Sequence, residues 1–461
     1  MRKSDMPDRP SAKEGLTQWL VERCMQARFR ELPADVRVVA AQCVLDCLGS
    51  SLAAVREPAP DIVLSELASR GGLPEATAIG RDLRLPAACA AEYNGTLAHA
   101  LDYDDVHLAI TGHATAVVLP ALLALAEQRG DVSGASLLAA LVAGCEMACR
   151  VGRLIAPSHY ARGFHSTATA GALGAAVACA HLAGLSQEQA RIALGLAATQ
   201  SSGLKAMFGS MGKPWHAGLA ARNGLMAVQL AARGFTGPAD ILESPQGFAR
   251  AYSDDFHIDA ALEEPPGGWH LRNTLFKYHA SCYGTHAAME ALLMLQREHG
   301  FTAEEVAAID LRVHDSCANV CDIRRPGNDT EARFSLNACA AMTLAGLDTS
   351  SPQEFSADSL AHPQVHRLIP RVELAFGEEI PKMASEVRVT LENGRAHRVF
   401  HDAGVAAKDL RVQQEKVEAK FATIAGGVFG SANAARLSQA VRDLGETSLE
   451  PLLTALRSCI L

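Results

Sequence analysis

One short stretch, LDYDDVHLAITGH at residues 101–113, gathers side chains that can move protons or bind metals. It contains Asp102, Asp104, Asp105, His107 and His113. Such a density of carboxylates and imidazoles is typical of a metal site, of a set of acid–base catalysts, or of a solvated loop. The spacing of the histidines fits neither HExxH nor another zinc pattern, and the acids lack the spacing of an EF-hand. The pattern therefore favours acid–base use of Asp102 and His113 over a metal.

Three polar segments stand at the start of expected helices. His113 directly precedes the segment TAVVLPALLALAE, and His165, in GFHST, precedes another apolar segment. In GSMGKPWH, Lys213 is followed by Pro214, a residue favoured in the first helical turn. A helix N-terminus offers free N–H donors and partial positive charge, which suit a carboxylate or phosphate and keep a nearby imidazole neutral. Ordinary capping explains each start alone, but the three together predict a site for an anionic substrate.

A fourth polar segment, LFKYHASCYGTH at residues 275–286, lies where the helical pattern gives way to a mixed one. It carries Lys277, His279, Ser281, Tyr283 and His286. Because clefts between domains are common ligand sites, this segment is a candidate for the opposite wall of a pocket. A polar hinge between domains explains it equally well, so both interpretations stay open.

The elements that must position these residues are mainly helices. From residue 12 to about 260 the sequence reads as helix, and Ser11-x-x-Glu14 is a capping box for the first one. Helices are expected from Pro33 and at 86–100, 114–128, 134–152, 166–183, 186–199, 214–233, 285–298 and 331–346. Strands are expected at 307–314 and in a hairpin, 385–391 with 396–400, joined by an Asn-Gly turn. We therefore expect a helical domain of residues 1–269 and 404–461, with an α+β insertion of residues 270–403.

Composition narrows the functional class. The 461 residues are 49% hydrophobic and 20% charged, as in a globular protein, and the net charge of −9 argues against a nucleic-acid surface. The 12 cysteines match no zinc or iron–sulfur spacing and are expected to be reduced thiols in the core. No signal peptide is evident, and Ala135–Cys149 looks too short and too polar at Glu146 to cross a membrane. We expect a cytoplasmic protein.

Several segments, in order, resemble the MmgE/PrpD family. They are NGTLAHALDYDDVH with a following GH, YARGFHSTATAGALGAAVACAHLAGLS, GSMGKPWHAGLAARNGLMAVQLAARGFTGP, KYHASCYGTH and EARFSL. The resemblance covers roughly residues 14 to 420. It implies a mainly α fold, in which both chain ends form a large all-helical domain and a smaller α+β lid domain is inserted. It also implies a homodimer that works on a small carboxylate without metal or organic cofactor.

The resemblance also implies which residues form the site. By motif, the catalytic candidates are Asp102, His113, His165, Lys213 and His286. The candidates for binding substrate are Lys277, Ser281, Tyr160 and Arg162. In this scheme Lys213 binds a carboxylate, His165 or His113 moves a proton on the neighbouring carbon, and Asp102 orients its neighbour. His286 of the lid acts as a second acid or a carboxylate ligand.

The activity within the family is left open by the sequence. The family's decarboxylase branch would place a Thr and a Tyr where this chain has Val106 and Asp322, and one extra residue separates Asp102 from His113. We therefore expect a hydro-lyase similar to 2-methylcitrate dehydratase first. An epimerase similar to iminodisuccinate epimerase comes next, and then a decarboxylase similar to cis-aconitate decarboxylase. A non-catalytic helical binding protein and a metal-dependent hydrolase are the rival classes.

Overall fold

A computed structural model describes residues 15–461, so the expected capping box at Ser11 and Glu14 lies outside the described residues. The chain divides into two compact units. The first holds the residues up to Phe276 together with Lys408–Leu461, and the second holds Lys277–Ala407. The sequence placed the borders after residues 269 and 403, because the connecting segments carry no helix or strand pattern of their own.

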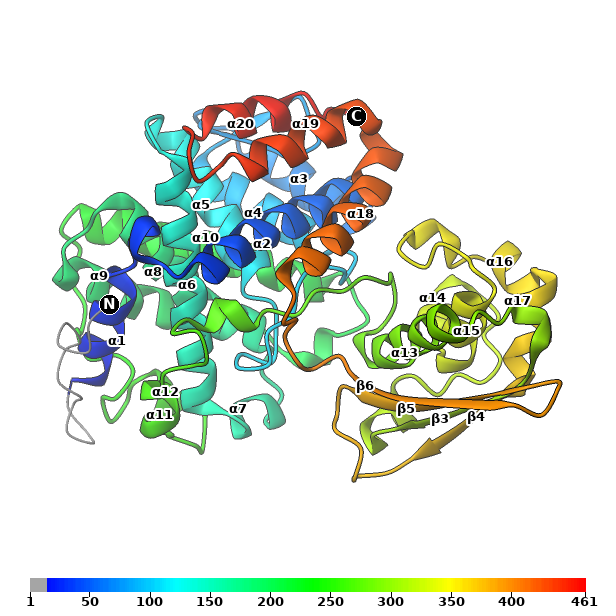
Figure 1. Ribbon diagram of the computed structural model, residues 1–461. Helices are drawn as coiled ribbons and strands as arrows, with labels where there is room; N and C mark the ends of the chain where they lie inside the picture. Colours follow the sequence, from blue (N-terminus) through cyan, green and yellow to red (C-terminus); the bar gives the residue numbers. More distant parts are fainter. Residues whose placement is uncertain (1–14) are drawn as a thin grey trace. The chain divides into compact units, whose positions relative to one another are not determined.

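The first unit is built almost entirely of helices (Figure 1). They are α1 (Leu16–Met25), α2 (Ala34–Ala53), α3 (Pro58–Ser69), α4 (Ala87–His99), α5 (Thr115–Arg129), α6 (Gly134–Ile155), α7 (Ser158–Ala161), α8 (Ser166–Ala183), α9 (Gln187–Ala198), α10 (Gly212–Ala232), α11 (Phe248–Tyr252), α12 (Ile258–Leu262), α18 (Leu410–Phe429), α19 (Ser431–Arg442) and α20 (Glu450–Arg457). Short 3-10 helices lie at η2 (Phe29–Glu31), η3 (Lys205–Met207) and η4 (His270–Asn273), and β1 (Ala76–Thr77) pairs with β2 (Arg84–Leu85). The mainly α fold expected from the sequence is confirmed.

Small residues let the central helices pack closely. A side chain added at Gly174 of α8 would place its Cβ only 2.7 Å from the carbonyl oxygen of Gly144 on α6. Only glycine fits at such a contact, because the two backbones nearly touch. Gly174 therefore serves the close packing of α8 against α6.

Helix α6 corrects one expectation. The sequence suggested a segment too short to span a bilayer, but α6 has 22 residues and is one of three helices, with α2 and α8, that are long and apolar enough to do so. The apolar windows of these helices are 78% to 89% buried inside the protein. Within α6, Glu146 makes a buried ion pair with Arg150 at 2.7 Å, so the charge is neutralised inside the core.

The C-terminal helices belong to the first unit. Helix α18 packs along α2 (Figure 1). Its buried Lys420 donates to Asp46 of α2 and to the backbone carbonyl of Tyr103, each at 2.6 Å. The chain end thus holds the loop that carries Asp102 and Asp104.

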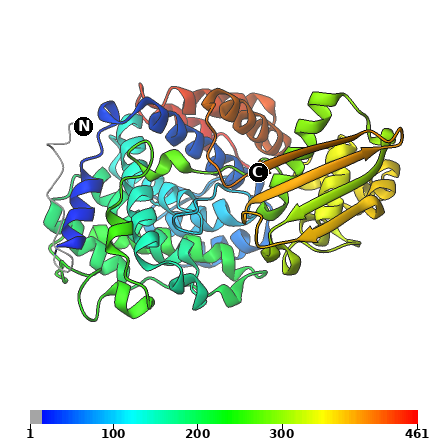
Figure 2. The ribbon, with the colours of Figure 1, turned by 60° about the horizontal axis from the view of Figure 1, so that its bottom comes forward.

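The second unit is a four-stranded sheet with helices on one face (Figure 2). The strand order is β4 (Val372–Phe376), β3 (Val306–Val313), β5 (Ala384–Leu391) and β6 (Ala396–Asp402). The helices are α13 (Tyr283–His299), α14 (Asp329–Arg333), α15 (Leu336–Leu344), α16 (Ala357–Ala361) and α17 (Pro363–Leu368). The β5–β6 hairpin turns at Asn393-Gly394, as predicted, and Gly394 adopts the left-handed φ of 82° that such a turn needs.

The helix expected at 331–346 is in fact two helices, α14 and α15. The break falls at Phe334 and Ser335. The Ser335 hydroxyl accepts a hydrogen bond from the Ala338 N–H and so begins α15 as its N-cap. The helical pattern continues on both sides of Ser335, so the sequence alone did not show this cap.

Candidate active site

The loop between α4 and α5 brings Asp102, His113 and Lys213 together in the first unit. The Lys213 ammonium lies 2.8 Å from Oδ2 of Asp102, and Nε2 of His113 lies 3.4 Å from Oδ1 of the same carboxylate. Asp102 has a positive φ of 50°, a strained conformation for a residue with a side chain. The side chain of Asp102 is 40% exposed, that of Lys213 18% and that of His113 11%. The three groups therefore line a surface that small molecules can reach.

Behind them lies a second carboxylate, Asp104, which is fully buried between two imidazoles. Nδ1 of His99, at the end of α4, contacts Oδ1 of Asp104 at 2.9 Å, and Nδ1 of His113 lies 3.0 Å from its Oδ2. Burial alone would raise the pKa of Asp104, but the imidazoles of His113 and His99 outweigh it and hold that pKa well below its usual range. Asp104 is therefore a buried anion.

The next carboxyl group along the chain is in the opposite state. Burial, and then the charge of Asp46, raise the pKa of Asp105 well above its usual range, and hydrogen bonds from Thr115 and Cys43 only partly offset this. Asp105 is therefore held as a neutral acid beside the charged Asp104. Such a split between neighbouring carboxyl groups follows from their different partners.

His165 stands at the start of α8 as an uncharged imidazole. Burial first, and then the neighbouring His99 and Lys213, lower its pKa far below the usual value. Its Nδ1 lies 3.2 Å from Nδ1 of His216 on α10, so one of the two nitrogens carries a hydrogen and the other accepts it. The ring of Phe208 contacts it edge-on, with ring centroids 4.9 Å apart. A neutral, positioned imidazole can accept a proton.

Four side chains of this site have donor atoms within 4.8 Å of one another, which is a spacing that a metal ion can use. They are His99, Asp102, Asp104 and His113. The oxygens of Asp104 already face two imidazole nitrogens, however, and the Lys213 ammonium supplies a positive charge at Asp102. These contacts favour hydrogen bonding within the site over metal binding.

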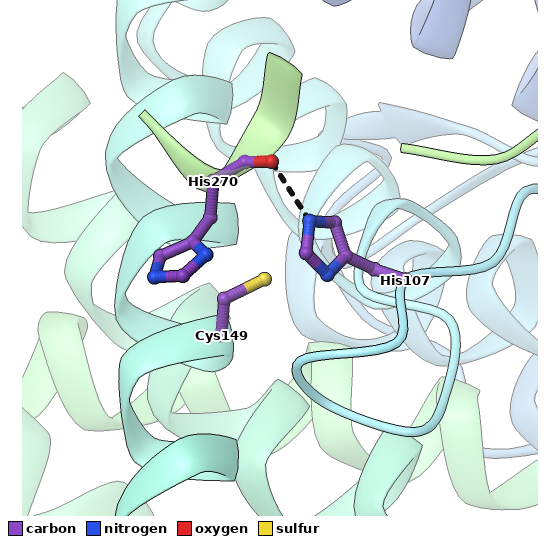
Figure 3. A group of neighbouring side chains, drawn as sticks. All are labelled: His107, Cys149 and His270. Carbon is purple, nitrogen blue, oxygen red and sulfur yellow. Dashed lines mark hydrogen bonds between the residues drawn. The ribbon is translucent and has the colours of Figure 1, made fainter. Parts of the chain in front are cut away.

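His107 belongs to a different buried group, with Cys149 of α6 and His270 of η4 (Figure 3). Its Nε2 donates to the carbonyl oxygen of His270 at 2.7 Å, and its Nδ1 accepts from the N–H of Ala109 at 3.1 Å. Both ring nitrogens are thus used, which leaves no lone pair for a metal. The metal interpretation of residues 101–113 needed His107 and His113 to converge, and they fall into separate groups.

Comparison with known proteins identifies the family. Residues 18–261 match the MmgE/PrpD N-terminal domain and residues 279–446 match the MmgE/PrpD C-terminal domain. The chain belongs to the MmgE/PrpD family. Cis-aconitate decarboxylase from Aspergillus terreus (strain NIH 2624 / FGSC A1156) is 27% identical over 97% of this chain and 96% of its own length. The Homo sapiens cis-aconitate decarboxylase is 29% identical, over 81% and 80%, and that of Mus musculus is 30% identical, over 74% and 72%. These relatives are decarboxylases, the activity that we expected from the sequence only after a dehydratase and an epimerase.

Of the two first-unit residues predicted to bind substrate, Tyr160 lies nearer the site. Burial, and then the charge of Asp102, raise the pKa of the Tyr160 phenol. The Lys205 ammonium lies 3.7 Å from the centre of its ring and adds positive charge there. Arg162 instead faces Asp254 at 3.5 Å, and both side chains are largely exposed. Their binding of substrate stays a prediction.

The remaining family candidates lie in the second unit, around the start of α13. Lys277, Ser281 and His286 are all buried there. Ser281 shares a hydrogen bond with Thr285 at 2.8 Å, and Nε2 of His286 lies 3.4 Å from the carbonyl oxygen of Ser281. Burial, and then His279 and Lys277, hold the pKa of His286 well below its usual value. These residues form a neutral-histidine group of their own, and their catalytic role stays a prediction.

Sequence reasoning missed three partners. His99 and His216 carried no functional prediction, and Asp104 was noticed only as part of an acidic stretch. The sequence did contain a signal for His99. It lies five residues before Asp104 in AHALDYDD, and the two residues flank an expected helix end. The contact between His165 and His216 joins residues 51 positions apart on two helices, and no local pattern announces it.

Proposed function

We propose that this protein is a lyase that acts on a di- or tricarboxylate by moving a proton on the carbon beside a carboxylate. The observation that carries the proposal is the pair of histidines in opposite surroundings. His165 is buried and neutral, whereas His113 lies between the carboxylates of Asp102 and Asp104. His165 carries no proton and can remove one from the substrate once a bound carboxylate beside it raises its pKa, and His113, between two carboxylates, can deliver one.

Charge near the site supports a carboxylate substrate. A C–H group beside a carboxylate is a weak acid. When it loses its proton, additional negative charge develops on the carboxylate oxygens. The Lys213 ammonium and the N–H groups that begin α5 and α8 provide positive potential in the same region. We therefore assign Lys213 to the substrate carboxylate, in exchange for part of its contact with Asp102.

In a dehydration, His165 removes the proton from carbon and the C–H electrons form the C=C bond. The hydroxyl group on the next carbon leaves with its bonding electrons and takes a proton from Nε2 of His113, which gives water. The apolar Val106 and acidic Asp322, where the decarboxylase branch would have Thr and Tyr, are the observation that favours this reaction.

In a decarboxylation, a C–C bond breaks, CO2 leaves, and the electrons remain on the carbon beside the second carboxylate. His113 then protonates that carbon. The names of the relatives favour this second reaction, which would be tried first with cis-aconitate. Return of a proton to the opposite face, without loss of a group, would make the protein an epimerase. We propose that it works in the cytoplasm as a homodimer, without metal or organic cofactor.

Proton NMR in D2O, with purified protein and a panel of acids, tests the proposal. The panel contains cis-aconitate, citrate, 2-methylcitrate, malate-type hydroxy acids and iminodisuccinate stereoisomers. New vinyl signals from a hydroxy acid indicate a dehydratase, and conversion of cis-aconitate with release of CO2 indicates a decarboxylase. Loss of one α-proton signal with appearance of a second stereoisomer indicates an epimerase. A panel in which no proton exchanges and no product forms would contradict the lyase proposal.

A further inference from the structure

Asp104 and Asp102 both contact His113, but from opposite sides and in different surroundings. Asp104 is fully buried and faces Nδ1 at 3.0 Å, whereas Asp102 is 40% exposed and faces Nε2 at 3.4 Å. Asp102 is also held by the Lys213 ammonium at 2.8 Å. Asp102 therefore lies on the side that a substrate reaches, and Asp104 lies behind the ring.

The state of Asp104 determines where the hydrogens of the two imidazoles lie. An ionised carboxylate only accepts hydrogen bonds, so each ring nitrogen that faces it must carry a hydrogen. Those nitrogens are Nδ1 of His99, hydrogen-bonded at 2.9 Å and 3.2 Å to the two oxygens, and Nδ1 of His113, which lies 3.0 Å from Oδ2 without the alignment of a full hydrogen bond. Nε2 then holds the lone pair when His113 is neutral, and carries the exchangeable proton toward Oδ1 of Asp102 when His113 is protonated.

The backbone around Asp104 and His113 is fixed at both ends. Lys420 of α18 donates to the carbonyl of Tyr103, directly before Asp104. The N–H of His113 donates to the hydroxyl of Thr167 on α8 at 3.2 Å. These contacts hold the backbone on both sides of the pair, so the Asp104 carboxylate and the His113 ring extend from a fixed main chain.

We propose that Asp104 is the positioning residue of His113: it fixes the tautomer with hydrogen on Nδ1 and leaves Nε2 as the atom that exchanges protons with the substrate. His99 completes the arrangement by holding the second face of the Asp104 carboxylate. The catalytic consequence rests on the proposed function, but the tautomer is a property of the protein alone. Asp102, which the sequence assigned to orienting its neighbour, then serves the substrate side with Lys213.

The first test compares two neighbouring substitutions of the same chemical size. Asp104→Asn replaces a buried anion with an amide that both donates and accepts, so one of the two imidazoles is forced into another tautomer. We expect kcat to fall by about 100-fold or more, with KM changed less than about threefold, because the substrate-facing groups remain. Asp105→Asn exchanges a neutral acid for a neutral amide one position later, and kcat should change less than about threefold. Equal losses in the two variants would overturn the proposal.

The second test needs no substrate. Histidine labelled with 15N, with His113 assigned by the signal lost in His113→Gln, reports which ring nitrogen carries hydrogen. We expect a protonated Nδ1 on His113 in the unsubstituted protein, with an N–H proton shifted far downfield by the carboxylate. Hydrogen on Nε2 alone would overturn the proposal, even if Asp104→Asn fails to fold. Failure of the lyase proposal would appear instead as an inactive panel with the Nδ1 tautomer intact.

Discussion

The loop between α4 and α5 serves two buried histidine groups that differ mainly in charge. In one, Asp104 lies as an anion between His99 and His113. In the other, His107 and His270 meet a backbone carbonyl and the thiol of Cys149, whose pKa is raised well above its usual value by burial. Burial alone favours the neutral form of an imidazole. A buried carboxylate beside the ring favours its protonated form, because the carboxylate accepts a hydrogen bond from the ring N–H. The first group is therefore suited to chemistry, and the second to holding the loop in place.

Substitutions at the substrate-facing site should affect turnover far more than stability. Lys213→Ala and His165→Ala should each lower kcat/KM by about 100-fold or more, because charge binding and proton transfer act on the transition state. The melting temperature of Lys213→Ala should change little, and that of His165→Ala should fall by a few degrees, because the buried His165 loses its contact with His216. Turnover of the NMR substrate and thermal unfolding are the two measurements. A fall of many degrees in melting temperature for both variants would mean that the groups are structural.

The group around His107 should show the reverse. His107→Ala leaves the carbonyl of His270 and the N–H of Ala109 without their buried partner. The free energy of unfolding, measured in urea, should fall by about 2–4 kcal/mol, because each unsatisfied buried group costs about 1–3 kcal/mol. His107→Gln, whose amide can donate and accept, is the matched control and should recover part of the loss. An unchanged free energy of unfolding in His107→Ala would contradict the structural role of the group around His107.

Acid should destabilise the protein partly through His270. Burial, and then His107 and Arg150, lower its pKa to about 2, whereas in the unfolded chain it is about 6.5. Unfolding therefore takes up a proton at this residue below about pH 6.5, so the stability contributed by the neutral form is lost as the pH falls from 6.5 toward 2. The slope is about 1.4 kcal/mol per pH unit for one such group.

Urea unfolding at pH 7.5 and pH 5 measures this contribution. The protein contains other buried neutral histidines, so the comparison is with His270→Gln, which should lose about 2 kcal/mol less between the two pH values. An identical pH dependence in the variant would show that His270 accepts a proton in the folded state, and the second group would then resemble the first.

The sequence predicted the elements better than the contacts between them. Helix α8 spans 166–183 as expected, and the other first-unit helices for which bounds were predicted differ at their ends by at most three residues, because apolar periodicity and capping are local. The exception at Ser335 is a cap in a segment whose helical pattern continues on both sides of it. The site residues could be chosen by motif, but which carboxylate pairs with which histidine depends on distances across the fold. Asp104 and Asp105 are adjacent and chemically identical in sequence, and only their partners make one an anion and the other a neutral acid.

Removal of metal ions should change turnover least of all. It tests the group around Asp104 most directly. If Asp104 is satisfied by two imidazoles and Asp102 by Lys213, then neither carboxylate needs a cation for stability or chemistry. Treatment with a chelator followed by dialysis should leave lyase turnover within about twofold of that of the untreated protein, because there is no bound ion for the chelator to remove. Added Zn²⁺ should compete with the protons that His99 and His113 hold toward Asp104, and so should inhibit, since metal ligation requires deprotonated nitrogens. Loss of turnover on chelation, with recovery on adding a divalent ion, would convert the four donors around Asp104 into a metal site and leave His113 as a ligand rather than a proton carrier.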